Sequence, residues 1–164
     1  MGAVTVIIRE PLPGDADELA AVHVNGWRDT YAHLLPERFY DEAAYRRRVD
    51  MWTRIIGERN PASTVRVAET DGIIVGFGMA GPALGEDAVR DLELYSIYVA
   101  TAHHGGGAAQ ALLDAVLGAA PAQLWVVADN ARAQAFYRRN GFQPDGATKI
   151  EEHLENLADI RMVR

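Results

Sequence analysis

The stretch HHGGGAAQALLDAVL, residues 103–117, decides the fold that we expect for this chain. Three consecutive glycines run directly into alanines and leucines at helical spacing, so a helix begins on backbone with almost no side chains. The first turn of a helix has four N–H groups without intrahelical partners and carries about half a positive charge. An anion can accept hydrogen bonds from these N–H groups and balance this charge. Small residues let the anion approach the backbone, so Gly105 to Ala109 predict a phosphate site. The alternative is that the small residues serve only close helix packing.

The segments on both sides of this turn indicate strands. DLELYSIYV, residues 91–99, precedes it, and the apolar segment 123–128 follows the helix of residues 107–117. A strand, a helix and a strand joined by short connections form a βαβ unit with parallel strands. The glycines therefore lie at the C-terminal edge of a strand, where open α/β sheets bind ligands.

The strand of residues 91–99 changes phase in its middle. Its aliphatic residues occupy first even and then odd positions: Leu92, Leu94, Ile97 and Val99. A β-bulge near Tyr95 and Ser96 produces such a slip and leaves backbone groups unpaired. The alternative is a strand buried on both faces, where parity carries little meaning.

The remaining elements follow from periodicity and turn residues. We expect a single domain over residues 1–164, because no linker or repeat interrupts the chain. The expected elements are a strand at 4–9, a helix at 15–31 with Asp15 as N-cap, a helical region at 36–56, a hairpin at 63–82 that turns at Asp71-Gly72, and a helix at 131–139.

Composition narrows the classes of function. The formal charge is −7, from 16 basic and 23 acidic residues, which disfavours a nucleic-acid binder. The acidic surplus either attracts cationic partners or is solvated surface. There are no cysteines, and the five histidines show no metal-ligand spacing with carboxylates, so we expect no metal. Without a signal core or a long apolar run, we expect a cytoplasmic protein that does not enter a membrane.

Two common phosphate loops do not fit the glycine turn. The dinucleotide fingerprint fails because its sixth position, counted from Gly105, is Gln110, and the P-loop fails because no Gly-Lys-Ser/Thr follows. The pattern that fits is a polar or basic residue followed by G-x-G-x-G/A, which runs here from His104 to Ala109.

A second signal lies in LWVVADNARAQAFYRRNGF, residues 124–142. Asn130 can N-cap a helix, and Asn140-Gly141 can end it. On that helix Ala133, Phe136 and Tyr137 share one face, which turns Tyr137 toward the preceding strand.

These two blocks, residues 92–117 and 124–142, resemble the GNAT superfamily of acetyl-CoA-dependent N-acetyltransferases. The second contains N-x-x-A-x-x-F-Y-x-x-x-G-F without a gap. The resemblance implies an α/β (α+β) fold, with a mixed, mostly antiparallel sheet flanked by helices. It also implies that the central parallel strands splay near Val99 and Ala128 and hold acetyl-CoA between them.

The resemblance also implies roles for individual residues. The turn would hold the coenzyme A pyrophosphate, and the bulged strand would pair with the pantetheine arm. Asn130 would hold that arm, and Tyr137 would lie near the thioester sulfur. The implied cofactor-binding residues are Ile97, Tyr98, Val99, His104, Gly105, Gly106, Gly107, Ala108, Ala109, Asn130 and Tyr137. One departure is His104, where the family has Gln or Arg; a neutral histidine predicts weaker or pH-dependent coenzyme binding.

Acetyl transfer needs a base, oxyanion donors and an acid. An alkylamine with a pKa of about 10.4 must lose a proton before it attacks, and Glu93 is our candidate base. N–H groups of the bulged strand can stabilise the oxyanion, and Tyr137 can protonate the thiolate. Trp27 and Tyr31, together with Tyr40, are candidates for the wall of the acceptor site. The alternatives are an exposed strand carboxylate for Glu93 and core packing for the aromatic residues.

We therefore expect an N-acetyltransferase that acts by direct attack on a primary amine of a small molecule, amino acid or peptide. One alternative is a non-catalytic coenzyme-A-binding sensor or interaction domain. Another is an enzyme for longer acyl groups, if Gly76 and Gly78 widen the cleft and do not simply relieve strand packing. A homodimer stays open, and the acceptor is not encoded in either motif.

Overall fold

A mixed β-sheet organises the protein, and a computed structural model describes it for residues 4–164. In that part of the chain the strand order is β1-β2-β3-β4-β5-β7-β6. The strands are β1 (Ile7–Arg9), β2 (Thr64–Thr70), β3 (Ile73–Pro82), β4 (Leu92–Val99), β5 (Gln123–Val127), β6 (Gln143–Glu151) and β7 (Leu157–Val163). Only β4 and β5 pair in parallel, and the other neighbours are antiparallel. This confirms the mixed, mostly antiparallel sheet.

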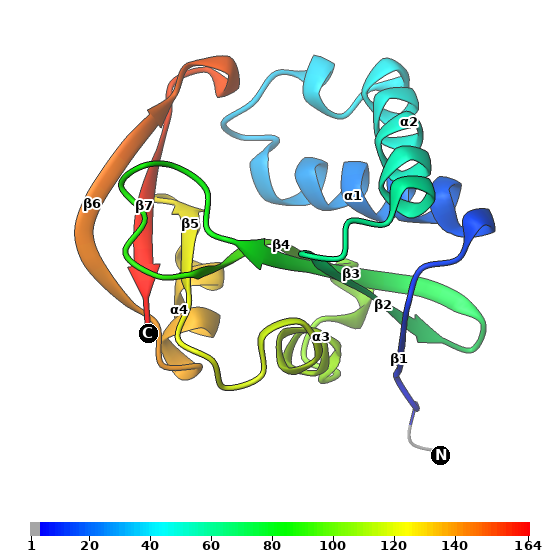
Figure 1. Cartoon of the computed structure of the whole chain (residues 1–164). Coiled ribbons are helices and arrows are strands. Elements are labelled where there is room, and N and C mark those ends of the chain that lie inside the picture. Colours follow the sequence, from blue (N-terminus) through cyan, green and yellow to red (C-terminus); the bar gives the residue numbers. More distant parts are fainter. Residues whose placement is uncertain (1–3) are drawn as a thin grey trace.

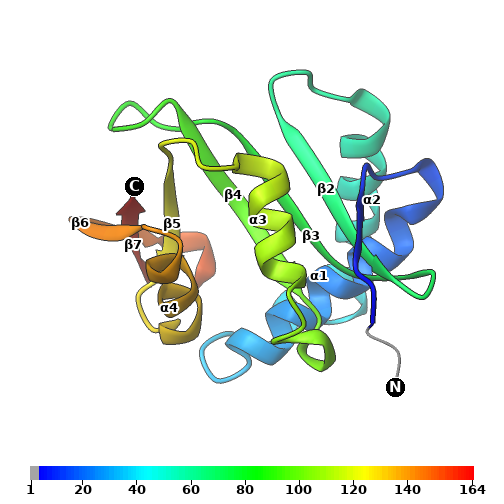
Figure 2. The ribbon, with the colours of Figure 1, turned by 90° about the horizontal axis from the view of Figure 1, so that it is seen from below.

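Helices cover both faces of the sheet (Figures 1 and 2). They are α1 (Ala16–Tyr31), α2 (Glu42–Glu58), α3 (Ala108–Leu117) and α4 (Ala131–Arg139). Figure 2 shows α1 and α2 on one side of β2–β4 and α3 on the other. The apolar residues of α3 and α4 share one core with β5 and β7, through Leu113, Leu124, Tyr137 and Met162.

The two central strands separate soon after they meet. β4 pairs with β5 only at Glu93↔Gln123 and Leu94↔Leu124. Beyond these pairs the strands diverge, so the C-terminal half of β4 has β3 as a partner on one side only. The expected splay between the strands that end near Val99 and Ala128 is confirmed.

A bulge at Tyr95 changes the phase of β4. Met79 pairs with Ser96 and Ala80 pairs with Leu94, which leaves Tyr95 as the extra residue. Leu94 and Ile97 consequently pack on the same side, against α3, although residues three positions apart lie on opposite sides of a regular strand. Of the two readings of this strand, the β-bulge is confirmed.

Two element boundaries differ from the sequence predictions. The first strand covers only Ile7–Arg9, where we expected residues 4–9. The helical region expected at 36–56 breaks at Asp41, between a single 3₁₀ turn (Glu37–Phe39) and α2. The Asp41 carboxylate accepts a hydrogen bond from the Ala44 N–H at 2.8 Å and caps α2.

The hairpin of β6 and β7 has no counterpart in the sequence predictions. Most residues of β6 are exposed, so this strand lacks the alternation of apolar and polar residues that marks a half-buried strand. β7 lies between β5 and β6 and pairs with both of them. Its position depends on contacts between segments far apart in the sequence.

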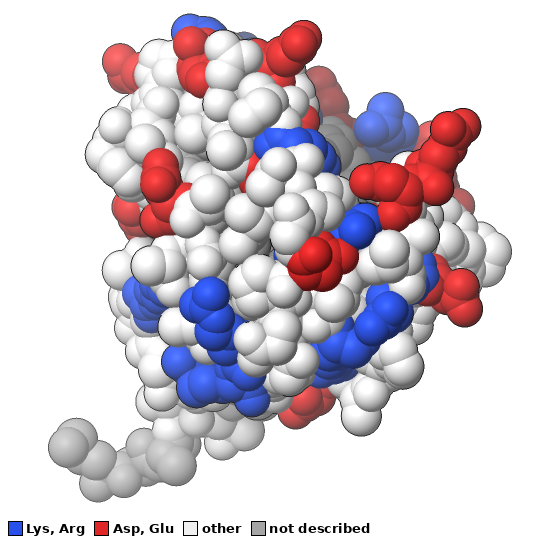
Figure 3. All heavy atoms as spheres, turned by 90° about the vertical axis from the view of Figure 1, so that its left-hand side faces the viewer, with Lys and Arg blue, Asp and Glu red and all other residues white. Residues whose placement is uncertain are grey.

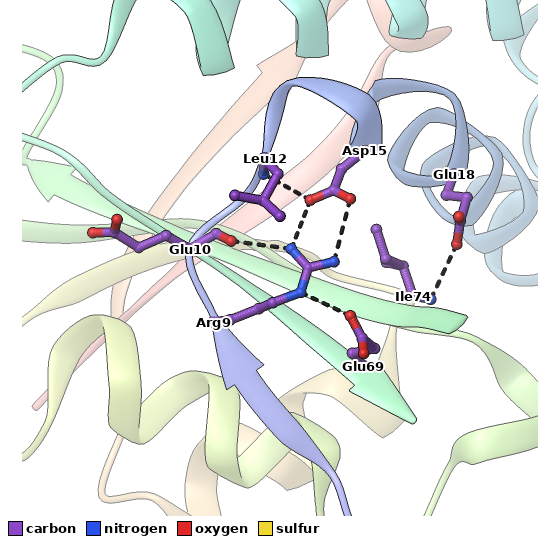
Figure 4. A network of polar contacts seen from close by, with 7 residues as sticks. All are labelled: Arg9, Glu10, Leu12, Asp15, Glu18, Glu69 and Ile74. Atoms are coloured by element: carbon purple, nitrogen blue, oxygen red, sulfur yellow. Dashed lines mark hydrogen bonds and ion pairs between the residues drawn. The ribbon is translucent and has the colours of Figure 1, made fainter. Parts of the chain in front are cut away.

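Arg9 connects β1 to its surroundings (Figure 4). Its Nε donates to Glu69 of β2 at 2.8 Å, and its Nη1 donates to Asp15, just before α1, at 2.7 Å. The hydrogen bond from Arg9 holds the pKa of the Asp15 carboxyl below its usual value of 3.8. Asp15 also accepts from the Leu12 N–H, so one carboxylate fixes the entry to α1.

No helix formed by residues 4–164 combines the length and apolar character needed to span a bilayer.

Candidate functional site

A cavity of about 570 Å³ lies at the opening between β4 and the start of α3, and we call it the glycine-turn cavity. α4 and α1 complete its walls, through residues such as Arg132 and Gly26. Nearly all residues that the family resemblance assigned to coenzyme binding line it: Ile97, Tyr98, Val99, His104, Gly105, Gly107, Ala108, Ala109, Asn130 and Tyr137. Gly106 is the exception, and a side chain there would meet the carbonyl of His103.

The backbone of the turn needs glycine for conformation as well as for access. Gly105 and Gly107 have φ of 79° and 86°, in the left-handed region that other residues avoid. A Cβ at either position would meet no atom within 4 Å, so the space around the turn is open. Gly107 is the N-cap of α3 and offers no side chain to its first N–H groups. These groups therefore face a cavity without a capping partner from their own N-cap.

Two arginines and one aspartate, Arg132, Arg139 and Asp29, line this cavity, so its lining carries a net positive charge although the whole chain carries −7. Arg132 and Arg139 of α4 line the cavity and are exposed. Figure 3 shows Lys and Arg side chains grouped on the lower part of one face, whereas Asp and Glu dominate the upper part and the upper right. Cations next to an uncapped helix start favour a ligand with several negative charges.

His104 occupies part of the edge that β4 presents to this cavity. Its Nε2 lies 2.8 Å from the carbonyl oxygen of Val99, with which it forms a hydrogen bond. Val99 lies beyond the residues of β4 that pair with β5. A ligand that pairs with the Val99 carbonyl therefore competes with the His104 ring for this oxygen.

A second cavity, of about 180 Å³, opens at the same splay, and we call it the Asp159 cavity. Trp27 and Tyr31 of α1, our candidates for the wall of an acceptor site, both line this cavity. β4 contributes Ser96, and β7 contributes Asp159. Tyr40 lies outside both cavities, where its hydroxyl donates to the Leu35 carbonyl at 3.2 Å.

The two cavities share a boundary at α4 and β4. Ile97, Tyr98, Asn130, Ala133 and Tyr137 line both of them. The side-chain oxygen of Asn130 accepts from the Ala133 N–H at 3.1 Å and caps α4, which positions this boundary. Tyr137 is therefore accessible from both sides of the splay.

The phenols at this boundary are held in their neutral form. Burial, and secondly the nearby Tyr31, raise the pKa of Tyr137 above its usual value of 10.0. Burial likewise raises the pKa of Tyr31, which the neighbouring Asn130 and Tyr98 offset in part. Neutral phenols donate hydrogen bonds, so this boundary offers donors to a ligand.

The structure does not bring Glu93 to either cavity. Glu93 is buried, and its Oε2 accepts from the Leu84 N–H at 2.7 Å. Its pairing partner Gln123 accepts from the Val89 N–H at 2.8 Å. Both side chains thus fix the loop between β3 and β4. Gly76 and Gly78 do not line the cavities either, because they pack closely against β4 and α3.

Among the residues of the Asp159 cavity that our site predictions did not include, Ser96 and Asp159 are the two that have a buried, unpartnered polar atom in the described part of the chain. Ser96 stood in the sequence only as a marker of the bulge, and Asp159 belongs to a strand that the sequence did not reveal. The alternation of Ile160 and Met162 was the only local sign of β7. In the part of the chain from residue 4 onward, no three His, Asp or Glu side chains converge in a way that could hold a metal ion.

The splayed sheet, the uncapped helix start and the two adjoining cavities define an acetyltransferase-type architecture. A model of the acetyltransferase (GNAT) family matches residues 25–142, and the chain belongs to this family.

Similar proteins agree with this assignment. An uncharacterized N-acetyltransferase of Mycobacterium tuberculosis is 39% identical over 113 residues, which are 64% of this chain and 69% of that protein. The uncharacterized N-acetyltransferase YuaI of Bacillus subtilis is 32% identical over 108 residues, 66% of this chain. The match spans only 60% of the length of YuaI. The fold is similar to that of PaiA N-acetyltransferase from Thermoplasma acidophilum, with a TM-score of 0.66, 19% identity and coverage of 96% and 98% of the two chains.

Proposed function

We propose that this protein is an N-acetyltransferase that transfers the acetyl group of acetyl-CoA to a primary amine by direct attack. The observation that supports this most strongly is that the glycine-turn cavity and the Asp159 cavity meet at Tyr137. Two reactants that enter from the two cavities would lie next to each other, and such positioning removes much of the entropic barrier. Relatives named N-acetyltransferase, and a neighbour in fold solved with coenzyme A, point the same way.

Acetyl-CoA fits the chemistry of the glycine-turn cavity. Its phosphates would bind to the N–H groups around Gly107 and Ala108, with Arg132 and Arg139 as counter-charges. Its pantetheine arm would run along the part of β4 that β5 leaves unpaired, and Asn130 borders that path. The ring of His104 would turn away from Val99 to admit it.

The residues at the boundary supply the groups that acetyl transfer needs. The neutral amine attacks the acetyl carbonyl carbon, a C–N bond forms and the C–S bond breaks. Backbone N–H groups of β4 beyond Leu94 would stabilise the oxyanion. The hydroxyl of Tyr137 would protonate the sulfur, because the burial that raises the pKa of this phenol also disfavours a bare thiolate. Glu93 has no part in this proposal, since Leu84 holds its carboxylate outside both cavities.

A screen for thiol release across amines, amino acids and peptides tests the proposal, together with calorimetry of coenzyme A. We expect the Tyr137→Phe variant to bind coenzyme A as the wild type does and to lose about 100-fold in kcat, which is typical of a lost general acid. Tyr40→Phe is the matched control, since this phenol lies outside both cavities, and should leave kcat unchanged.

The opposing outcomes are distinct. Unchanged kcat in Tyr137→Phe would remove Tyr137 from its role. Binding of coenzyme A without thiol release from any amine would favour a sensor, and a longer donor that outperforms acetyl-CoA would favour another acyltransferase.

A further inference from the structure

The Asp159 cavity contains polar atoms that lack partners. Asp159 lies on β7 opposite Val127, and its Oδ1 is buried without a hydrogen bond to any residue from 4 to 164. Within the same part of the chain, Trp27 Nε1 and Ser96 Oγ are also buried and unpartnered, and both residues line this cavity. Buried polar atoms nearly always have partners, so three in one small cavity mark it as a place for polar groups from outside the chain.

The charge of this cavity selects the sign of that ligand. Among the described residues that line it, Asp159 is the only charged one. Lys149 and His153 lie nearby, but both already pair with Glu151, at 2.8 Å and 3.4 Å. Burial raises the pKa of the Asp159 carboxyl; Lys149 and His153 lower it, and Glu151 raises it further. Lys149 lies directly across from Asp159 on β6, yet among the described residues no ion pair joins them. A half-buried carboxylate with one unpartnered oxygen is stabilised by a cationic ligand.

The walls of the cavity select the rest of the ligand. Trp27, Tyr31 and Trp125 supply aromatic surface, and Leu154 and Leu157 supply aliphatic surface. Its 180 Å³ would hold about six water molecules, or one group of the size of an aromatic side chain. Two of these rings already face a cation of the protein, Trp27 with Arg48 at 5.0 Å and Trp125 with Lys149 at 4.7 Å, so the aromatic walls offer apolar surface to the stem of the ligand.

We propose, building on the proposed function above, that Asp159 binds the ammonium group of the acceptor and that the acceptor is an amine on an aromatic or apolar stem. An amine with a free carboxylate on the adjacent carbon would be rejected. That carboxylate would be buried beside Asp159 with no cationic residue among those that line the cavity.

This assignment gives the amine proton a destination. One ammonium proton passes to the Asp159 carboxylate, and the freed amine attacks the acetyl carbonyl carbon. As the C–S bond breaks, Tyr137 gives its proton to the sulfur, and the second proton lost by nitrogen restores the phenol. Water then deprotonates Asp159, so the cycle releases an amide, a thiol and one proton.

A matched pair of acceptors tests the inference: 2-phenylethylamine and phenylalanine differ only in the α-carboxylate. We expect kcat/KM for 2-phenylethylamine to exceed that for phenylalanine by about 100-fold. In Asp159→Asn the KM for this amine should rise by about 30-fold, as for a lost partner of a desolvated charge pair, while the KM for acetyl-CoA stays constant. Asp91→Asn is the control, since Asp91 is exposed, outside both cavities and of equal charge.

A binding measurement separates this inference from the proposed function. With coenzyme A present, 2-phenylethylamine should raise the Tm of the wild type and of Asp91→Asn but not that of Asp159→Asn. If the amine binds in this way and no thiol is ever released, the ammonium site stands and the proposed function fails. The inference is overturned if thiol is released but Asp159→Asn has the wild-type KM for 2-phenylethylamine. It is also overturned if kcat/KM for phenylalanine equals that for 2-phenylethylamine.

Discussion

At the scale of single residues, His23 shows how burial changes a side chain's chemistry. It lies on α1 and is 6% exposed. The ring centroids of Phe77 and Tyr98 lie 5.0 Å and 5.4 Å from its own. Burial, and secondly the charge of Arg48, lower the pKa of His23 from 6.5 to about 3. The folded protein therefore keeps this ring neutral at pH values where the unfolded chain protonates it.

This difference predicts a pH-dependent stability. Between pH 6.5 and about 3 the unfolded state binds more protons than the folded state, because only the unfolded chain protonates His23. The stability that the neutral His23 ring contributes is therefore fully present above pH 6.5 and is lost as the pH falls from 6.5 to about 3. We expect the free energy of unfolding to decrease by about 1.4 kcal/mol per pH unit in this window because of His23 alone. Urea titrations of the wild type and His23→Leu over this window measure it. The control is His33→Gln, at an exposed histidine, which should keep the wild-type slope of unfolding free energy against pH. If His23→Leu kept that slope as well, His23 would not be its source.

The sequence placed some single residues together and misplaced others. Of the residues predicted for coenzyme binding, all but Gly106 line one cavity, because their motif spacings are local to one strand end and one helix start. Glu93 was misplaced because the alternation of a strand gives its face but not its position along the cleft. Its carboxylate lies near the end of β4 that pairs with β5, away from the opening.

At the scale of elements, a short polar network fixes β1, a strand too short to be held firmly by packing alone. β1 has only three residues, and its Arg9 joins it to β2 and to the start of α1. The Arg9 and Asp15 side chains are 25% and 13% exposed, so this pair is only partly screened by solvent.

We expect Arg9→Met to lower the free energy of unfolding by about 1–2 kcal/mol at pH 7, because Asp15 and Glu69 lose their cationic partner. Arg9 holds the pKa of Asp15 below 3.8, so this contribution is present above that pH and lost as the pH falls through the lowered pKa. The gap between variant and wild type should therefore narrow in acid. Chemical denaturation at pH 7 and pH 3 measures it. Arg46→Met, in an exposed pair with Glu42, should change stability by under about 0.5 kcal/mol; a similar loss in both variants would count against the network.

Elements with strong local patterns were predictable, and those that depend on distant pairing were not. The α3 and α4 segments carry their own start and stop residues, and the bulge at Tyr95 was visible as a change of phase. β6 carries no such pattern because both of its faces are largely exposed. Because this hairpin was missed, the sequence could not place Asp159 in the same cavity as Trp27.

At the scale of the whole molecule, charge is unevenly distributed. The net charge of −7 would repel a coenzyme with several phosphates, yet Arg132 and Arg139 stand at the cavity proposed to hold it. At moderate salt, charges act over about 10 Å, so Arg132 and Arg139, which outnumber the one carboxylate that lines the cavity (Asp29), outweigh the more distant carboxylates.

We therefore expect the combined variant Arg132→Ala with Arg139→Ala to raise the Kd for coenzyme A by about tenfold, because two phosphate partners are lost. Its Kd should also depend less on salt than that of the wild type. Calorimetry at 50 mM and 300 mM salt measures both effects. Arg46→Ala, which leaves the cavity intact, serves as the reference, and indistinguishable affinities would place the phosphates elsewhere.

The surplus residue in β4 has a consequence for how this protein can vary. Side chains of a strand alternate sides, so Tyr95 sets the phase of everything downstream of it. If the chain were one residue shorter at this point, the side chains that follow in β4 would move to the opposite side of the sheet. Tyr98 would then leave the aromatic surroundings of His23, and Ile97 would leave α3. We therefore expect deletion of residue 95 to disturb the packing of β4 more than replacement of Tyr95 does.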